Sequence, residues 1–328
     1  MSASERSLLL ALGNARARDG PDHRTSTFDV AVEDDGDGLL VTGTVSDGEL
    51  VSLVTDVVAD HPEPVTIDLD VLAASAADRT VATPVATVRD RPDDDAEQIT
   101  QALYGSAVTA FDRDGDWTRA RVEDGYVGWL PTDALAIPVD IDLDAVLAWP
   151  VDAGDLDAAA GDIPDRLHIG TPCQIGDDTG STATVTFRTG ETVSVPGDAV
   201  IRPPAAPSGE DLVAVAERFL ETEYVWGGKT VDGIDCSGLV WIAARVNGLS
   251  LPRDSDQQST LGRPVDRENL QPGDLLFFPG HVAISTGGPD YVHASGSAEA
   301  VVPGSLDPDG EGYREDLDEG MTGARRIV

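Results

Sequence analysis

A cysteine at the predicted start of a helix and two histidines further along are the residues of this 328-residue chain best suited to chemistry. Regularly spaced apolar residues predict a helix that begins near Cys236 and ends at Gly248. The unpaired N–H groups and the dipole at a helix N-terminus favour the thiolate, which is the nucleophilic form of cysteine. We therefore expect Cys236 to ionise readily and to act as a nucleophile.

His281 and His293 lie in two strand-like runs that are separated by a Gly-Gly-Pro-Asp turn sequence. In a hairpin, two such residues reach the same face of neighbouring strands. One imidazole beside Cys236 would accept the thiol proton, while the second polar group would hold that ring in the required tautomer. The alternative for each histidine is an ordinary core or surface position. Cys173, inside a β-rich stretch, is expected to be a buried and inert thiol.

The first half of the chain is predicted to hold two small units. Residues 1–78 form an α/β module of unknown function, with strand-like runs at 28–32 and 39–45 and a helix-like stretch at 50–59. Residues 79–138 consist of short strand-like runs separated by Asp-Gly turn pairs. That spacing predicts a small antiparallel barrel.

The second half is predicted to hold a connector, a second β-rich unit and the segment with the chemistry. Residues 139–203 contain an acidic, helix-prone connector at 140–165, followed by a divergent β-rich stretch. Consecutive prolines at 203–207 predict a stiff linker, because they favour extended backbone. The cysteine and both histidines lie beyond it, in residues 209–328.

The charge balance excludes two classes of partner. The chain has 60 acidic and 22 basic side chains, a formal net charge of −38. Such a charge repels phosphates, and no cluster of basic residues reverses the field locally, so we expect neither nucleic acid nor a membrane as a partner. Lys229 is the only lysine, and Asp far outnumbers Glu. This pattern indicates adaptation to high salt, where a Debye length of about 3 Å or less screens self-repulsion; the alternative is an ordinary acidic protein.

The cysteine and histidine patterns predict neither a metal nor a cofactor. Two cysteines cannot make a disulfide framework, and no CxxC or paired-histidine spacing is present. The apolar run at 8–12 is too short for a secretory signal, and no apolar stretch approaches the roughly 18 residues of a membrane span. We therefore expect a cytoplasmic protein.

Three ordered blocks within residues 209–302 resemble the NlpC family of papain-like cysteine peptidases: YVWGGKTVDGIDCSGLVWIAARVNGLSLPRDSDQQ, LQPGDLLFFPGHVAIS and YVHAS. The resemblance implies an α+β fold in which the nucleophile helix packs on an antiparallel sheet that carries both histidines. It assigns Cys236 as the nucleophile, His281 as the general base and then acid, and His293 as the group that orients His281. The oxyanion would meet the Cys236 backbone N–H and the Tyr224 hydroxyl.

The stretch TQALYGSAVTAFDRDGDWTRARVEDGYVGWLPTDAL resembles bacterial SH3-like domains, and 139–203 is expected to contain a second, divergent one. Two such domains before this catalytic domain are similar in architecture to γ-D-glutamyl-L-diamino acid endopeptidases, which trim cell-wall peptides. The resemblance implies that a tyrosine of the first SH3-like domain closes the substrate pocket. Tyr104 and Tyr126 are both candidates.

The same resemblance implies that Trp226, Asp235, Ser237 and Ser255 line the substrate pocket. The carboxylate of Asp235 would pair with the free amine of an N-terminal L-Ala, which would restrict the enzyme to short peptides with a free N-terminus. The alternative is that Asp235 only caps the helix that begins at Cys236.

The sequence thus predicts a cysteine peptidase that hydrolyses small peptides through a thioester intermediate. Two other functions remain open. The chain could be a catalytically silent protein that binds a peptide or glycan through its SH3-like domains. Alternatively, one cysteine and two histidines are suitable ligands for a metal ion, although no fourth ligand lies nearby in the sequence.

Overall fold

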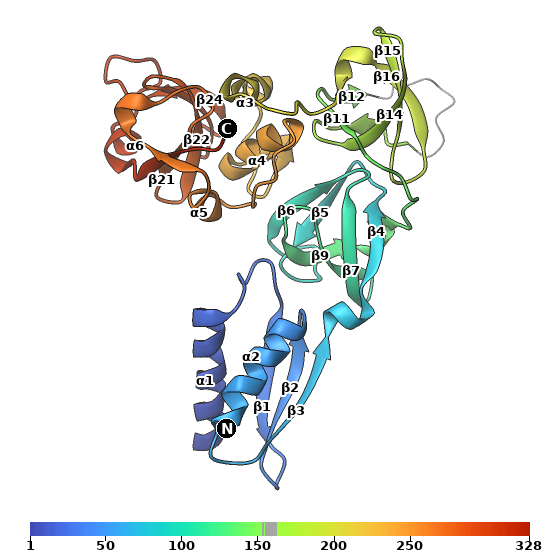
Figure 1. Cartoon of the computed structure of the whole chain (residues 1–328), viewed down its shortest axis with the longest axis vertical. Helices are drawn as coiled ribbons and strands as arrows, with labels where there is room; N and C mark the ends of the chain where they lie inside the picture. Colours follow the sequence, from blue (N-terminus) through green and yellow to red (C-terminus); the bar gives the residue numbers. More distant parts are fainter. Residues whose placement is uncertain (153, 155–162) are drawn as a thin grey trace.

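The computed structural model describes residues 1–152, 154 and 163–328, whose helices and strands form four successive units (Figure 1). In the first unit, β1 (Phe28–Asp34), β2 (Leu39–Val45) and β3 (Val65–Val71) form one sheet. Strands β2 and β3 are parallel, and α2 (Gly48–Ala59) connects them.

The first unit also contains a helix that sequence analysis did not predict. The N-terminal helix α1 (Ala3–Asp19) starts with a capping box in which Ser2 and Glu5 satisfy each other's backbone N–H. It buries Leu8 and Leu12, one helical turn apart, against the sheet and α2. The apolar run at 8–12 is therefore one face of an amphipathic helix.

The second unit is a seven-stranded antiparallel sheet, in the order β10-β4-β7-β8-β9-β5-β6. Its turns lie at the predicted Asp-Gly pairs, where Gly115 and Gly125 adopt a positive φ that favours glycine. We call this unit the first barrel. Its strands are β4 (Ala77–Val81), β5 (Val85–Arg89), β6 (Gln98–Leu103), β7 (Ala107–Asp114), β8 (Trp117–Arg121), β9 (Val127–Pro131) and β10 (Leu135–Ala136).

The third unit, called the second barrel here, is a five-stranded sheet in the order β16-β15-β14-β11-β17, next to a short β12-β13 ribbon. Its strands are β11 (Ala145–Leu147), β12 (Val151–Asp152), β13 (Arg166–Leu167), β14 (Pro172–Asp178), β15 (Thr182–Thr186), β16 (Thr192–Pro196) and β17 (Val200–Ile201).

The helix-prone connector predicted at 140–165 is wrong for the part that forms β11. All three residues of β11 are buried, and the strand lies between β14 and β17. Burial on both faces explains the continuous apolar run, which does not distinguish a short buried strand from a helix. Residues 153 and 155–162 of the predicted connector lie outside the described residues.

In the fourth unit, helices pack on a six-stranded antiparallel sheet in the order β20-β25-β21-β22-β23-β24 (Figure 1). We call this unit the peptidase domain, after the activity that its sequence predicts. Together with the barrels, this arrangement confirms the predicted α+β fold. Its elements are α3 (Gly209–Ala216), β18 (Lys229–Thr230), β19 (Gly233–Ile234), α4 (Cys236–Val246), α5 (Ser255–Gln258), β20 (Arg263–Val265), β21 (Leu275–Phe278), β22 (His281–Gly287), β23 (Asp290–Ser295), β24 (Ala300–Ser305), α6 (Glu315–Gly320) and β25 (Gly323–Arg326).

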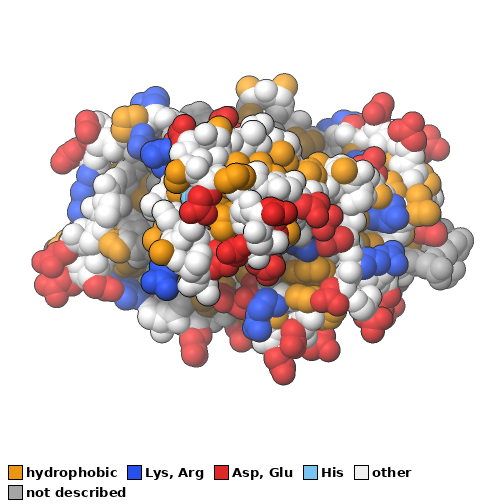
Figure 2. All heavy atoms as spheres, turned by 90° about the horizontal axis from the view of Figure 1, so that it is seen from below, with side chains coloured by type: hydrophobic (Ala, Val, Ile, Leu, Met, Phe, Trp, Pro, Cys, Tyr) orange, Lys and Arg blue, Asp and Glu red, His pale blue; other side chains and the backbone are white. Residues whose placement is uncertain are grey.

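The core of the peptidase domain lies between α3, α4 and the sheet. Leu239 and Ile242 of α4 pack with Phe277, Val282 and Ile284 of the sheet, and all are nearly inaccessible. None of the described helices is long and apolar enough to cross a membrane. Acidic side chains are spread over the face seen in Figure 2, as expected from the composition.

Candidate active site

The nucleophile candidate sits at the first position of α4, as predicted. The helix begins at Cys236, and its N-cap residue Asp235 accepts a hydrogen bond from the backbone N–H of Gly238 at 2.7 Å. At the other end, Gly248 adopts a positive φ of 76° just after the helix, as a C-terminal glycine does. The Cys236 side chain is 8% exposed, so it lies in the core but is not sealed off.

The two histidines meet on neighbouring strands of the sheet. His281 begins β22 and His293 lies in β23, and the two strands are antiparallel. The Nε2 atom of His281 is 2.7 Å from Nδ1 of His293. Next to His281, the backbone N–H of Val282 forms a hydrogen bond with the sulfur of Cys236. The structure therefore brings the predicted cysteine and both histidines into one site.

The protonation states differ from the expectation of a thiolate. Burial, and then the charge of Asp235, raise the pKa of Cys236 to about 11, although the N–H groups of Val282 and Ser237 act in the opposite direction. Burial lowers the pKa of His281 to about 4 and that of His293 to about 3. The expected readily ionised thiol is thus wrong for the resting site, because loss of water outweighs the effect of the helix N-terminus.

Asp235 is held by an arginine that sequence analysis did not single out. Both carboxylate oxygens accept hydrogen bonds from Arg253, at 2.9 and 2.7 Å, and the guanidinium is 1% exposed. The backbone N–H of Gly227 donates to the same carboxylate at 2.7 Å. The structure therefore places Asp235 in the capping position that was one of its two predicted roles, and it adds a buried ion pair.

Of the other predicted pocket residues, Ser237 contacts this ion pair directly. Ser237 is buried, and its hydroxyl accepts a hydrogen bond from Arg253 at 2.8 Å. Ser255 is the first residue of α5, two positions after Arg253. Trp226 is 59% exposed. Burial, and then the charge of Cys236, raise the pKa of Tyr224 to about 12.

The structure separates the two candidate tyrosines of the first barrel. The Tyr104 ring packs edge-on against Phe187 of the second barrel, with ring centroids 5.1 Å apart. In contrast, the hydroxyl of Tyr126 donates a hydrogen bond to Asp254 of the peptidase domain at 2.5 Å. Of the two, Tyr126 is the one beside the peptidase site.

A second buried ion pair joins the first barrel to the peptidase domain. The Lys229 ammonium lies 2.7 Å from the Asp124 carboxylate, and these side chains are 2% and 0% exposed. It also lies 4.1 Å from the ring centre of Trp241. Sequence composition could have drawn attention to this residue, because Lys229 is the only lysine in the chain. The compact ammonium of a lysine suits this buried position. The forked guanidinium of an arginine would need more space and more hydrogen-bond acceptors.

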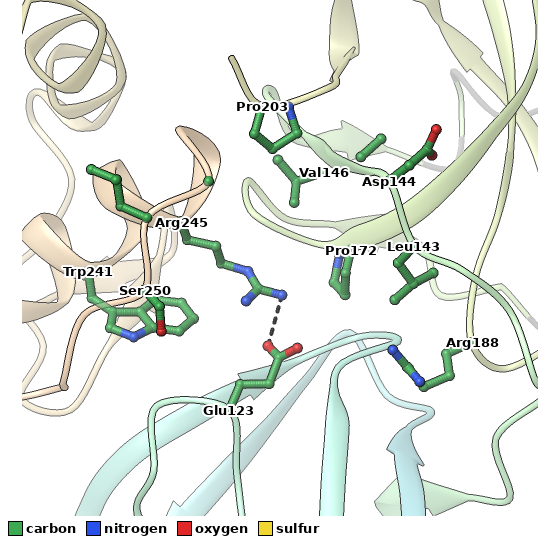
Figure 3. Close-up of a pocket in the computed structure, with 13 residues that line it drawn as sticks. Glu123, Leu143, Asp144, Val146, Pro172, Arg188, Pro203, Trp241, Arg245 and Ser250 are labelled. Carbon is green, nitrogen blue, oxygen red and sulfur yellow. Dashed lines mark ion pairs between the residues drawn. The ribbon is translucent and has the colours of Figure 1, made fainter. Parts of the chain in front are cut away.

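A cavity of about 410 Å³ lies between the two barrels and the peptidase domain, away from this site (Figure 3). An ion pair between Glu123 of the first barrel and Arg245 of α4 crosses it at 2.8 Å. None of the predicted site residues lines it. Among the described residues, no group of three His, Cys, Asp or Glu side chains is arranged to hold a metal ion, so the metal-site alternative gains no support there.

Comparison with known proteins identifies two parts of the chain. Residues 221–315 match the NlpC/P60 family, and residues 88–135 match the bacterial dipeptidyl-peptidase SH3 domain. The probable endopeptidase NlpC of Escherichia coli is 35% identical over 119 residues, which cover 77% of that protein. The chain belongs to the NlpC/P60 family. Its peptidase domain is accordingly that of a hydrolase, which confirms the enzyme class predicted from the sequence.

Two other relatives carry dipeptidyl-peptidase names, and the first of them matches beyond the peptidase domain. The γ-D-glutamyl-L-lysine dipeptidyl-peptidase of Bacillus cereus is 28% identical over 260 residues, or 70% of this chain and 75% of that protein. Dipeptidyl-peptidase 6 of Lysinibacillus sphaericus is 44% identical over 111 residues, and the match spans only 40% of its length. The crystal structure of an NlpC/P60 family protein from Bacillus cereus superposes with a TM-score of 0.65 at 23% identity, over 77% of this chain and all of that one.

Proposed function

We propose that this protein hydrolyses short peptides with a free N-terminus at γ-D-glutamyl-L-diamino acid or related bonds, through a thioester on Cys236. The observation that carries the proposal is the arrangement of three side chains. Cys236 lies beside the start of β22, and the 2.7 Å contact between His281 and His293 orients the ring that begins this strand. A nucleophile, a base and an orienting group are the parts that such chemistry requires.

The first step is a proton transfer coupled to attack. The contact between the Nε2 atom of His281 and Nδ1 of His293 leaves the Nδ1 atom of His281 for the thiol. Because the pKa of Cys236 is raised and that of His281 is lowered, the resting pair is a neutral thiol and a neutral imidazole. His281 therefore takes the proton as the sulfur attacks the carbonyl carbon, as a general base.

The next steps return that proton and release both products. The carbonyl oxygen becomes an oxyanion, which the Cys236 backbone N–H at the start of α4 and the Tyr224 hydroxyl stabilise. As the C–N bond breaks, the imidazolium of His281 protonates the leaving amine, and the acyl group remains on sulfur as a thioester. Water, deprotonated by His281, then attacks the thioester. The products are a carboxylic acid and the regenerated thiol.

The substrate class is supported by the relatives and by the barrel. The Bacillus cereus relative is named for a γ-D-glutamyl-L-lysine bond, and its similarity to this chain extends beyond the peptidase domain. Tyr126 brings the first barrel next to the predicted pocket residues Trp226 and Ser255, through its hydrogen bond to Asp254. A barrel at that place restricts access and favours short peptides over polymers.

The proposal also covers the setting of the enzyme. The two cysteines are free thiols, and the net charge of −38 is strongly acidic. Both features support the proposal that the enzyme acts in a reducing compartment with high salt, such as the cytoplasm of a salt-adapted cell. Assays therefore belong in concentrated KCl.

Replacing the nucleophile tests the proposal, and the second cysteine provides a matched control. We expect Cys236→Ala to lower the kcat for hydrolysis of L-Ala-γ-D-Glu-L-Lys by roughly 10⁴-fold or more, because no thioester can form. Cys173→Ala, which alters the other buried thiol in the second barrel, should retain activity. The measurement is release of the dipeptide and of lysine, followed by mass spectrometry. Hydrolysis by Cys236→Ala at the wild-type rate would contradict the proposal.

A further inference from the structure

The cavity between the two barrels and the peptidase domain has the size and the position of a ligand pocket (Figure 3). Its volume of about 410 Å³ is typical of pockets that hold small molecules, and such pockets occur preferentially where domains meet. Each of the three units contributes to the wall: Glu123 belongs to the first barrel, Arg188 to the second barrel, and Trp241 to α4. We call it the three-unit cavity.

The three-unit cavity lies toward the C-terminal end of the nucleophile helix. Arg245 of α4 lines it, nine positions after Cys236. At a helical rise of 1.5 Å per residue, the backbone positions of these two residues are about 14 Å apart. Cys236, His281 and His293 are not among the described residues that line the cavity. A molecule in the three-unit cavity therefore leaves the reacting side chains uncovered.

Each of the two carboxylates in the wall already has an arginine partner. Glu123 lies 2.8 Å from the Nη2 atom of Arg245, and this pair crosses the cavity (Figure 3). Asp144, which precedes β11, accepts a hydrogen bond from the Nε atom of Arg202 at 2.8 Å. Both negative charges of the wall are therefore balanced within the protein, and a cationic ligand would have to compete with these arginines.

Arg188 is the charged side chain of the wall that has no counter-charge. Its Nε atom is buried and has no hydrogen-bond partner, and no described carboxylate forms an ion pair with its guanidinium. Figure 3 shows this group pointing from the second barrel toward the cavity. A guanidinium keeps its proton in proteins, and a buried N–H without an acceptor costs free energy. An acceptor placed in the cavity would remove that cost.

The backbone around Arg188 is fixed by contacts between the two barrels. Arg188 lies in the turn between β15 and β16, where the backbone N–H of Gly190 donates to the carbonyl of Phe187 at 2.9 Å. On one side of Arg188, the ring of Phe187 packs against Tyr104 of the first barrel. On the other side, the hydroxyl of Thr189 lies 2.7 Å from that of Tyr104. The turn therefore holds the guanidinium at the wall of the cavity.

The rest of the wall limits the kind of molecule that can reach Arg188. Apolar side chains come from the second barrel, the proline linker and the peptidase domain: Leu143, Val146, Pro172, Pro203, Trp241 and Leu249. A carboxylate matches the guanidinium because its two oxygens accept two parallel hydrogen bonds. A doubly charged phosphate would bring one charge more than Arg188 balances, close to Glu123 and Asp144. The wall therefore suits one carboxylate on an apolar body.

We propose that the three-unit cavity is a second binding site, which takes a small monocarboxylate with an apolar body and holds its carboxylate on Arg188. The site is separate from the active site, so this inference does not depend on the proposed function. Because the wall comes from three units, a bound molecule adds contacts among both barrels and the C-terminal end of α4.

N-acetyl-L-leucine and N-acetyl-L-leucinamide are a matched pair of probes, because they differ only in the carboxylate. Calorimetry with the full chain in concentrated KCl should give the acid a Kd of about 1 mM or lower, and the amide should bind about tenfold more weakly or worse. Absence of binding by the acid overturns the proposal, and so does equal binding of acid and amide. Inorganic phosphate that binds as tightly as the acid overturns the preference for a monocarboxylate.

Variants of Arg188 test whether this side chain holds the carboxylate. Arg188→Gln should reduce the affinity for the acid to that for the amide, and Arg188→Lys, which keeps the charge without the fork, should lie between. Arg263→Gln is the matched control, because Arg263 is an exposed arginine of β20 that also has no ion pair among the described residues. It should bind the acid as the wild type does. Undiminished binding by Arg188→Gln, or an equal loss in Arg263→Gln, overturns the proposal.

Hydrogen exchange locates the bound acid. In the wild type, saturating N-acetyl-L-leucine should slow exchange at residues 143–147 and 185–190 of the second barrel and at residues 245–250 of the peptidase domain, all of which contain residues of the wall. The same concentration should leave these amides of Arg188→Gln unchanged. Slower exchange confined to residues 281–293 would place the acid in the active site and overturn the proposal.

The nucleophile variant separates this proposal from the proposed function. Cys236→Ala should bind N-acetyl-L-leucine with the wild-type affinity, because the sulfur does not line the cavity. Binding that depends on Arg188 in a protein without peptidase activity would overturn the reaction and support the second site. Peptide hydrolysis by a wild type that does not distinguish the acid from the amide would support the reaction and overturn the second site.

Discussion

The two barrels contact the same peptidase domain through charged pairs that differ in their exposure to solvent. Asp124 of the first barrel forms an ion pair with Lys229, and Thr100 accepts a hydrogen bond from Arg253. All four side chains are buried. The second barrel uses Arg166, which pairs with Asp232 at 2.7 Å while the two side chains are 42% and 57% exposed. The charged contacts of the first barrel are therefore buried beside the active site, whereas the charged contact of the second barrel is exposed to solvent.

Backbone packing completes the contrast. At the second barrel, the Gly170 carbonyl accepts a hydrogen bond from Arg245 of α4 at 2.6 Å. A Cβ at Gly170, where φ is +84°, would lie 2.5 Å from the Ile242 side chain. Close packing at Gly170 and a hydrogen bond to its backbone carbonyl therefore hold this barrel to α4. At the first barrel, Arg253 bonds both Thr100 of β6 and Asp235, the residue before Cys236. Lys229 bonds Asp124 in the turn after β8.

The largest expected effect comes from breaking the buried pair of the first barrel. Burial alone would raise the pKa of Asp124, but Lys229 outweighs it and the pKa is lowered, so the carboxylate is charged. Lys229→Met leaves that charge buried without a partner, and we expect unfolding to become easier by about 3–5 kcal/mol. The double variant Lys229→Met/Asp124→Leu should recover most of the loss. Urea unfolding at equilibrium measures both, and a single variant as stable as the double one would remove the contrast between the barrels.

Acid should loosen the second barrel before the first. Burial lowers the pKa of His168, which is 3.8 Å from Asp232 at this contact. The unfolded chain binds a proton there near pH 6.5, and the folded chain does not, so stability falls as the pH drops below about 6.5. One such group contributes at most about 1.4 kcal/mol per pH unit. Asp124 stays ionised over this range because its pKa is lowered.

Hydrogen exchange between pH 7 and pH 5 measures this difference. Amides of the second barrel, residues 163–201, should gain exchange relative to those of the first barrel, residues 77–136. His168→Gln, which cannot take up the proton, should lose the relative gain. Equal acceleration of both barrels would show that the acid effect has another origin.

The smallest effect is expected from the exposed pair of the second barrel. Arg166→Ala should cost less than about 1 kcal/mol of unfolding free energy, since solvent screens an exposed pair. The loss should shrink between about 0.1 M and 1 M salt, where the Debye length falls from roughly 10 to 3 Å. The Lys229→Met effect should persist over the same salt range, because no solvent lies between its charges. A loss for Arg166→Ala that is large and independent of salt would place this pair with the buried ones.

Local patterns predicted the catalytic elements well. Asp235 caps a helix that begins at Cys236, and the two histidines share a hairpin whose turn sequence was visible. The patterns failed where long-range context decides. The run Ala145–Leu147 is a strand because its neighbours are β14 and β17, and α1 is a helix because its leucines cover the sheet.

The site residues that escaped prediction are those whose meaning depends on a distant partner. Arg253 is an ordinary arginine in the sequence, yet it neutralises Asp235 and bonds Thr100, which lies 153 positions away. Arg24 meets Asp254 across 230 positions. Local spacing in the sequence does not predict such pairs. Sequence analysis also assigns charged side chains to the solvent-exposed surface by default, because few of them are buried in folded proteins.

The catalytic helix, the histidine hairpin and the identity of the reacting side chains were thus determined by the sequence, because capping, helical periodicity and hairpin turns act within a few residues. Only the tertiary structure decided the protonation of Cys236, the partner of Asp235 and the burial of Lys229. These depend on which side chains exclude water and which charges are brought together, and both are set by packing between units that are far apart along the chain.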